Sequence, residues 1–147
     1  TSKAVISQNI RTEMAAGNPA RGREVLLQAL RVSPRDPMQF LIYHNLAQSY
    51  FLEKDYAKAL EYGLLGASEA PHYPMLPLQN AAIYVGLNQI QKAKAAFETA
   101  RRLAPAFVQV HLGGTLYFRN PEHRQRFLTF TRIAAGLDDA SAADAIR

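Results

Sequence analysis

The chain has 147 residues, of which 48% are hydrophobic and 20% are charged, with a net charge of +5 and no cysteine. This length and balance are typical of one soluble globular domain and exclude a disordered chain. The absence of cysteine excludes disulfide bonds and thiolate chemistry, and it favours a reducing compartment.

The sequence carries no signal for a membrane or for export. No apolar run approaches the ~20 residues of a membrane-spanning helix, and the first residues do not have the pattern of a signal peptide. We therefore expect a cytoplasmic protein that does not bind a membrane. Because the chain begins at Thr1 without an initiator methionine, we also expect it to be a portion of a longer protein.

The first predicted helix hairpin spans residues 3–36. Apolar residues at helical spacing predict a helix over residues 2–16, which Gly17-Asn18-Pro19 ends. A second helix is predicted over residues 19–32, and Pro34 follows it. This hairpin is degenerate compared with the next two, as the end unit of a repeat protein can be, because one of its faces meets water.

The second predicted hairpin, residues 40–73, has helices over residues 37–52 and 55–70. Asp36-Pro37 predicts an N-cap followed by a proline in the first turn. Lys54-Asp55 is the short turn between the two helices.

The third predicted hairpin spans residues 74–107. Its first helix should begin late, since an interior proline costs ~3 kcal/mol and either Pro74 or Pro77 can be the first-turn proline. This helix ends at Gly86 or Asn88. Its partner covers residues 89–103, with these residues directed inward: Ile90, Ala93, Phe97 and Ala100.

The pattern changes after the third hairpin. The segment AFVQVHL predicts two helical turns, which Gly113-Gly114 ends. Asn120 and Pro121 predict the N-cap and first residue of a last helix, about residues 121–135, which Gly136-Leu137 ends. The weak periodicity of residues 138–147 predicts a frayed tail.

Small and aromatic residues recur in this chain with a period of 34 residues. The recurring pairs are Ala47 and Ala81, Tyr50 and Tyr84, Ala59 and Ala93, and Pro71 and Pro105. A fixed period of this length predicts stacked helix hairpins, in which small residues allow two helices to approach closely.

This pattern resembles the tetratricopeptide repeat. The matching residues are Tyr43, Leu46, Ala47, Tyr50, Ala59, Gly63, Gly66 and Pro71, then Ala81, Tyr84, Ala93, Phe97, Ala100 and Pro105. The sequence departs from the family pattern at Gly63, which replaces a bulky residue, and at Pro77 and Asn80, which replace an aromatic residue and a leucine.

The resemblance implies an all-α fold. We expect residues 1–137 to form a right-handed α-α superhelix of about three tetratricopeptide hairpins, the first of them degenerate, and a C-terminal capping helix.

Several segments are also similar to the C-terminal tetratricopeptide region of bacterial class III adenylate cyclases and winged-helix transcription regulators. They are SPRDP at residues 33–37, LAPAF at 103–107, FRNPEHRQRFL at 118–128 and AAGL at 134–137. In such proteins the repeat region follows the catalytic or DNA-binding domain and is thought to receive a signal through protein contacts. This likeness implies the regulatory or sensing part of a larger signalling protein.

Neither catalytic nor metal-binding patterns occur. The four histidines, none of which has a second ligand at helical spacing, are His44, His72, His111 and His123. The Asp138-Asp139 pair lies in the predicted tail, where nothing raises a pKa for acid-base catalysis, and no phosphate-binding glycine loop is present. We therefore expect a non-enzymatic chain without a metal ion or cofactor.

The positive charge does not by itself indicate nucleic acid. Lys and Arg are spread along the chain rather than collected in one stripe, and they cluster most at Arg21, Arg23, Arg31 and Arg35. This distribution favours a solvated helical face over a phosphate-binding patch, so we expect no nucleic-acid binding by this segment.

In tetratricopeptide proteins, the first helices of successive repeats line a concave groove. The resemblance implies that eight mostly apolar residues line the groove here: Leu41, His44, Gln48, Phe51, Met75, Leu78, Ala82 and Val85. The alternative is that some of them pack inside the solenoid or under the last helix. The basic residues with which chaperone-binding members grip a terminal carboxylate are missing.

Two functions fit these residues. The favoured one is a protein-protein interaction module, whose groove binds a peptide, a helix or another part of its own protein, with Phe51 and Leu78 as anchors. The alternative is a fragment of a cyclase or transcription regulator that serves in oligomerisation. Because exposed apolar patches commonly become interfaces, we also expect a homodimer.

Overall fold

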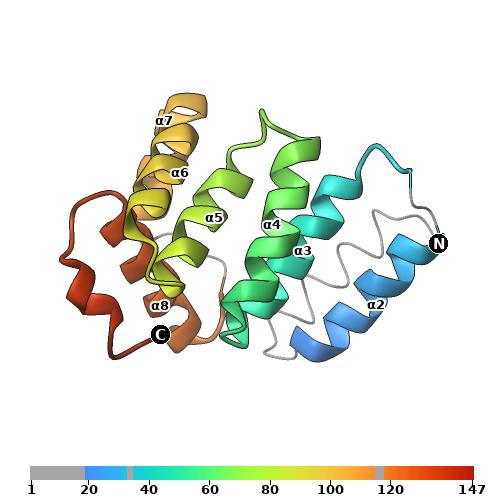
Figure 1. Ribbon diagram of the computed structural model, residues 1–147, viewed down its shortest axis with the longest axis horizontal. Coiled ribbons are helices and arrows are strands. Elements are labelled where there is room, and N and C mark those ends of the chain that lie inside the picture. The colour runs from blue at the N-terminus through green and yellow to red at the C-terminus, as the bar shows by residue number, and fades with distance from the viewer. Residues whose placement is uncertain (1–18, 33–34, 115–117) are drawn as a thin grey trace.

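The computed structural model describes residues 19–32, 35–114 and 118–147. These residues form seven α-helices, labelled as in Figure 1, with one short 3-10 helix and no β-strand among them. The elements are α2 (Pro19–Val32), α3 (Gln39–Leu52), α4 (Tyr56–Glu69), α5 (Met75–Gly86), α6 (Ile90–Leu103), α7 (Pro105–Leu112), α8 (Pro121–Ala134) and η1 (Ala140–Ala143). The predicted helix at residues 2–16 lies outside the described residues.

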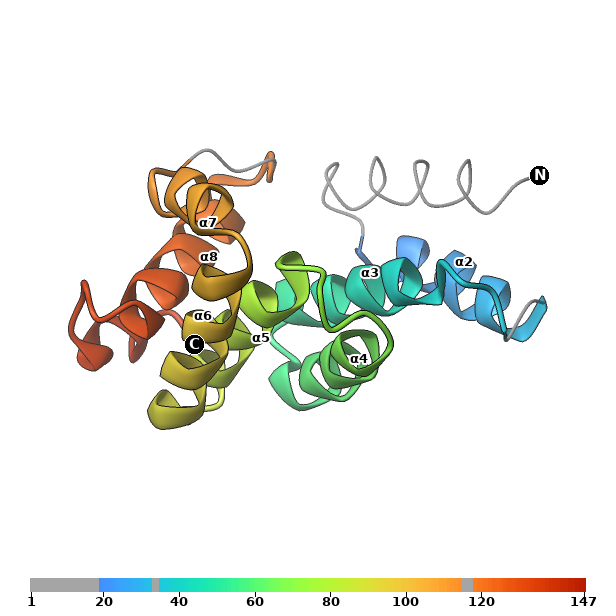
Figure 2. The same cartoon turned by 90° about the horizontal axis from the view of Figure 1, so that it is seen from above.

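Helices α2 to α6 lie side by side in chain order along the molecule (Figure 1). Helices α3 and α4 pack against each other, as do α5 and α6, and α4 joins the two hairpins by contacting α5. The described chain is therefore an α-α superhelical solenoid. Figure 2 shows α7 and α8 at the C-terminal end of the row. None of the described helices is long and apolar enough to cross a bilayer.

The second hairpin begins slightly later than predicted. Helix α3 starts at Gln39, and the Asp36 side chain accepts a hydrogen bond from the Met38 backbone N–H at 2.7 Å. Asp36 and Pro37 thus form a turn before the helix rather than its N-cap and first turn. Asp55 is the N-cap of α4, because its side chain accepts from the Lys58 backbone N–H at 3.2 Å.

The turns inside the two hairpins share one backbone conformation. Lys54 and Asn88, which are equivalent in the repeat, have positive φ angles of 66° and 57°. Lys54 donates its backbone N–H to the Phe51 carbonyl at 3.0 Å, and Asn88 donates to the Val85 carbonyl at 2.9 Å. The left-handed residue therefore satisfies a carbonyl that the end of the helix would leave unpaired.

Lys54→Gly is expected to raise the free energy of unfolding by about 0.5–1 kcal/mol, because glycine adopts a positive φ without a Cβ clash. Asn88→Gly is the matched control, and its gain should be smaller since asparagine tolerates this conformation. Urea unfolding of both variants measures the difference. A loss of stability in Lys54→Gly would contradict the turn geometry.

The third hairpin accommodates both prolines near its start. Pro74 is in the N-cap position of α5, so Pro77 is the third residue of the helix. The first N–H groups of a helix have no partner within it, and a proline there costs little. In α6, the predicted inward residues Ala93, Phe97 and Ala100 are buried, whereas Ile90 is half-buried.

Two of the departures from the repeat pattern contact each other. The Nδ2 atom of Asn80, in α5, donates a hydrogen bond to the carbonyl oxygen of Gly63, in α4, at 3.1 Å. A Cβ atom at position 63 would lie 2.0 Å from the Oδ1 atom of Asn80. The glycine therefore makes room for the asparagine, and the two departures are one coupled change.

The effect of Gly63→Ala should change sign with the residue at position 80. In the wild-type chain the added methyl group collides with Asn80, and we expect a loss of about 1–3 kcal/mol. With Asn80→Ala present, the same substitution should be neutral or stabilise by up to about 1 kcal/mol, because alanine has the higher helix propensity. Urea unfolding of both single variants and the double variant tests this coupling. Equal effects in both backgrounds would show that the residues act independently.

The C-terminal segment is packed where the sequence predicts fraying. Ala143 of η1 is fully buried, and the Arg147 Nε atom donates to the Val85 carbonyl at 3.0 Å. The segment lacks helical periodicity because it contains only a short 3-10 turn, which side-chain contacts fix against α5 and α8. Helix α8 itself is capped as predicted, by the Asn120 side chain, which accepts from the Glu122 backbone N–H at 2.8 Å.

Candidate functional site

The eight predicted groove residues lie on α3 and α5. Helix α3 carries Leu41, His44, Gln48 and Phe51, and helix α5 carries Met75, Leu78, Ala82 and Val85. Leu41 is half-buried, whereas the other seven are buried. They therefore line a covered interior in this structure, and their binding of a separate partner stays a prediction.

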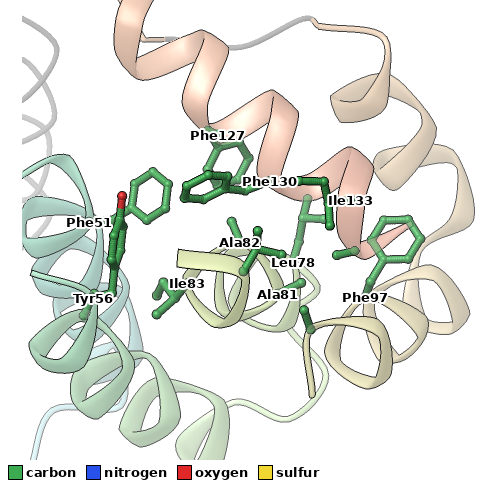
Figure 3. Packing of buried hydrophobic residues seen from close by; sticks show 14 of the residues in the cluster. Phe51, Tyr56, Leu78, Ala81, Ala82, Ile83, Phe97, Phe127, Phe130 and Ile133 are labelled. Atoms are coloured by element: carbon green, nitrogen blue, oxygen red, sulfur yellow. The ribbon is translucent and has the colours of Figure 1, made fainter. Parts of the chain in front are cut away.

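Helix α8 covers the apolar half of this surface. Figure 3 shows Phe127, Phe130 and Ile133 of α8 facing α5, with Phe51 approaching from α3. The ring centres of Phe127 and Phe130 lie 5.8 Å and 5.9 Å from that of Phe51, and both pairs meet edge to face. Such pairs add about 0.5–1.5 kcal/mol to the burial of the rings themselves.

The α5 residues of the apolar half belong to the same cluster. Leu78, Ala82 and Val85 have no exposed surface and share one hydrophobic core with Phe130 and Ile133. The last helix thus occupies the position that a bound peptide or helix was predicted to take.

A buried arginine fastens α8 to the end of α3. Arg126 is only 2% exposed, and its Nη1 atom donates to the Phe51 carbonyl at 2.7 Å and to the Tyr56 hydroxyl oxygen at 3.0 Å. Its Nη2 atom donates to the Leu52 carbonyl at 2.9 Å. Both carbonyls belong to the last turn of α3, where the helix dipole is negative. The helix end therefore provides partners for both Nη atoms of this buried cation, whereas its Nε atom has no hydrogen bond to the described residues.

A second arginine repeats this contact one repeat later. Val85 is the residue of α5 equivalent to Phe51, and its carbonyl accepts from Arg147 as described above. Arg147 also donates to the Asn88 side-chain oxygen at 3.0 Å and forms an ion pair with Asp144. Helix α8 thus contacts the end of α3, and the C-terminal segment contacts the end of α5.

The other half of the predicted groove is polar. The Nδ1 atom of His44 lies 3.2 Å from the Oε1 atom of Gln79, whose Nε2 atom donates to the His44 carbonyl at 3.1 Å. Because an amide oxygen only accepts, this pairing assigns the proton to Nδ1 of His44. The Tyr73 ring lies edge-on to the His44 ring, with 6.3 Å between their centres. Gln79 was not among the residues predicted to line the groove. Its sequence context, an amide side chain within an otherwise apolar helix, is the feature that could have indicated a polar role.

The pKa of His123, the histidine on α8, is lowered by its surroundings in the folded chain. Burial lowers the pKa of His123 below its usual value, and the positive charge of Arg126 lowers it further. The folded chain therefore disfavours the protonated imidazole that the unfolded chain accepts at mildly acidic pH.

Stability is therefore expected to fall as the pH decreases through ~6.5, because the unfolded state then binds more protons than the folded state. His123→Gln removes this contribution, so the difference in free energy of unfolding between pH 7.5 and pH 5.5 should be smaller in the variant. Urea unfolding at the two pH values measures it. The same difference in both chains would oppose a role for His123.

Two observations bear on metal binding and on the role of His111. They contain no group of three or more metal-binding side chains close enough to hold an ion. The Nδ1 atom of His111 lies 2.9 Å from the Phe107 carbonyl, and the two rings are tilted by 45° with their centres 4.2 Å apart. His111 thus takes part in packing on α7.

Two stretches of the sequence match family models for the tetratricopeptide repeat. The first match covers residues 8–74 and the second covers residues 81–107, which together are more than half of the chain. The fold is similar to the crystal structure of MamA, with a TM-score of 0.64 over 97% of this chain and 80% of that chain. Sequence identity is 16%, so this likeness supports the fold alone. No curated protein matches the sequence. The likeness to cyclases and transcription regulators stays a prediction.

Proposed function

We propose that this chain, which carries tetratricopeptide repeats, is a non-enzymatic protein-protein interaction module that binds an amphipathic helix between α3 and α5. Tetratricopeptide repeats generally mediate contacts between proteins. The observation that supports a helical ligand is α8, which packs against α5 and inserts its phenylalanines beside Phe51. The chain thereby provides its own ligand for this surface.

The buried side chains of α8 indicate which residues a competing helix would need in order to bind the same surface. Arg126, Phe127, Phe130 and Ile133 are buried and follow the i, i+1, i+4, i+7 spacing of one helical face. An arginine would reach the end of α3, and the three apolar residues would fill the surface over α5. A partner helix with this pattern can replace α8.

We place this module in the cytoplasmic, regulatory part of a larger signalling protein. The reason is that the order of short sequence segments in this chain resembles that in the C-terminal regions of cyclases and winged-helix regulators. A helix held by its own solenoid can be exchanged for that of another molecule, and exchange between two copies would give the predicted homodimer.

The test is binding of a fluorescein-labelled peptide with the sequence of residues 119–137 to the full chain. The wild-type chain should bind it weakly, because its own α8 occupies the site. Phe130→Leu weakens the intramolecular helix, so this chain should bind the peptide at least ~10-fold more tightly. Lys58→Ala, on exposed α4 surface, should bind like wild type.

The matched control is the same peptide with Arg126→Ala and Phe130→Ala. It should fail to bind both chains at concentrations that saturate the first peptide. Equal binding of both peptides, or absence of binding to the Phe130→Leu chain, would reject the groove as a helix receptor. Circular dichroism verifies that each chain is folded.

A further inference from the structure

Most of the net positive charge lies at the C-terminal end of the solenoid, where residues 90–147 contain nine Lys and Arg and five Asp and Glu. Residues 90–137 contain eight Lys and Arg but only two Asp and Glu, whereas residues 40–89 contain two and four. Among those eight, Arg126 alone is buried. The prediction of evenly spread charge is therefore wrong for this part of the chain, because the excess charge lies on α6, on α8 and just before α8, and α7 carries no Lys or Arg.

The same three helices enclose a recess of about 490 Å³. Its apolar walls are Phe97 of α6, Val108 and Leu112 of α7, and Ala135 at the end of α8. Ligand pockets commonly have volumes of about 300–1,000 Å³, so this recess can hold one or two aliphatic side chains. Figure 2 shows α6, α7 and α8 together at the C-terminal end of the row of helices.

Two arginines line the recess in similar arrangements. Arg101 uses its Nε and Nη2 atoms to bind the carboxylate of Glu98, and Arg132 uses the same atoms to bind Asp138 at 3.1 Å and 3.2 Å. Each pairing fixes the plane of the guanidinium group and leaves the Nη1 atom without a hydrogen bond to the described residues. The Arg101 pair is about half exposed and the Arg132 pair about one-third exposed, and such pairs near the surface contribute about 0–1 kcal/mol each, so a carboxylate of another molecule can compete for the arginines.

We infer that this recess docks an acidic segment of a partner protein, with an aliphatic side chain entering the recess while adjacent carboxylates bind Arg101 and Arg132. The apolar walls disfavour a ligand that is only charged, and the arginines disfavour a purely apolar one. The surrounding excess of Lys and Arg speeds the encounter with an acidic partner. The recess shares α8 with the proposed helix groove, because Arg132 and Ala135 form part of its wall, so displacement of α8 by a partner helix would also open the recess.

The probe is a fluorescein-labelled peptide, Asp-Glu-Leu-Leu-Asp-Glu, titrated with the full chain by fluorescence anisotropy. One control peptide has Asn and Gln in place of the acids, and the other has Ser in place of both leucines. Each control should bind at least ~10-fold more weakly, since a charged hydrogen bond and a buried aliphatic side chain each contribute that much or more.

Arg101→Gln and Arg132→Gln should each weaken binding of the probe about 10-fold, whereas Lys58→Gln, which removes an equal charge from α4, should change it less than twofold. Arg101 is exposed, and its ion-pair partner Glu98 lies on the same helix. Arg101→Gln therefore tests the role of the arginines even if Arg132→Gln disturbs folding.

Three results would overturn the inference. They are a probe that does not bind at millimolar concentration, a serine control that binds as tightly as the probe, and equal losses in Arg101→Gln and Lys58→Gln. Phosphatidylserine vesicles and a thymidine oligonucleotide are titrated in parallel. Tighter binding of either one than of the probe, with loss in Arg101→Gln, would assign the surface to that anion instead.

Discussion

Phe130→Ala is expected to lower the free energy of unfolding by about 3–5 kcal/mol, the largest effect of any variant considered for this chain. The Phe130 ring has no exposed surface and lies 5.9 Å from the Phe51 ring and 6.0 Å from the Tyr56 ring, measured between centres. Alanine would leave a cavity between α8 and the two hairpins. Urea unfolding followed by circular dichroism measures the loss.

Phe107→Ala is the control for Phe130→Ala. The Phe107 ring is half-buried on α7 and packs at the edge of the core, so the same truncation should cost clearly less there. Equal stability of the two variants would contradict the described packing of α8 against the two hairpins.

Arg126→Ala is expected to cost about 2–3 kcal/mol. The substitution removes two charged hydrogen bonds to the last turn of α3 and the contact of the guanidinium group with the Phe51 ring, 4.8 Å from its centre. Arg126→Met should lose less, because methionine keeps the apolar stem of the side chain in place. Urea unfolding ranks the variants.

The same helix offers a control for this arginine. Arg124 is exposed, and Arg124→Ala should change the free energy of unfolding by less than about 0.5 kcal/mol. Equal stability of Arg124→Ala and Arg126→Ala would mean that the buried guanidinium group contributes no net stability, as some buried charges do not.

The repeat and the helix bounds could be predicted from the sequence because their signals are local. Asp55 and Asn120 cap their helices by bonding to backbone within three residues, and the small residues Ala59 and Ala93 are fully buried where the period places them. The residues that the family resemblance assigned to a groove lie on α3 and α5, and their role in binding stays a prediction. Such features depend on neighbours in sequence or on the adjacent repeat.

The occupant of the groove could not be predicted in this way. Arg126 lies in the polar segment PEHRQRFL, where an arginine normally meets water, and its partners are 70 or more residues earlier in the chain. Gly63 and Asn80 look like two separate defects of the repeat until their contact is known. In each case the decisive interaction joins residues whose spacing follows no local period.

The binding of Arg126 to the end of α3 also affects how the chain can fold. In most solenoids each repeat contacts only its neighbours, so folding can start anywhere and spread from repeat to repeat. Here the apolar surface of α3 and α5 is completed by residues that are synthesised after both hairpins, and contacts between such distant residues slow folding. Until α8 has been synthesised, the nascent hairpins expose that surface to chaperones and to other chains. Helix α8 is thus the element that ends this exposure, once it has been synthesised and packs against α3 and α5.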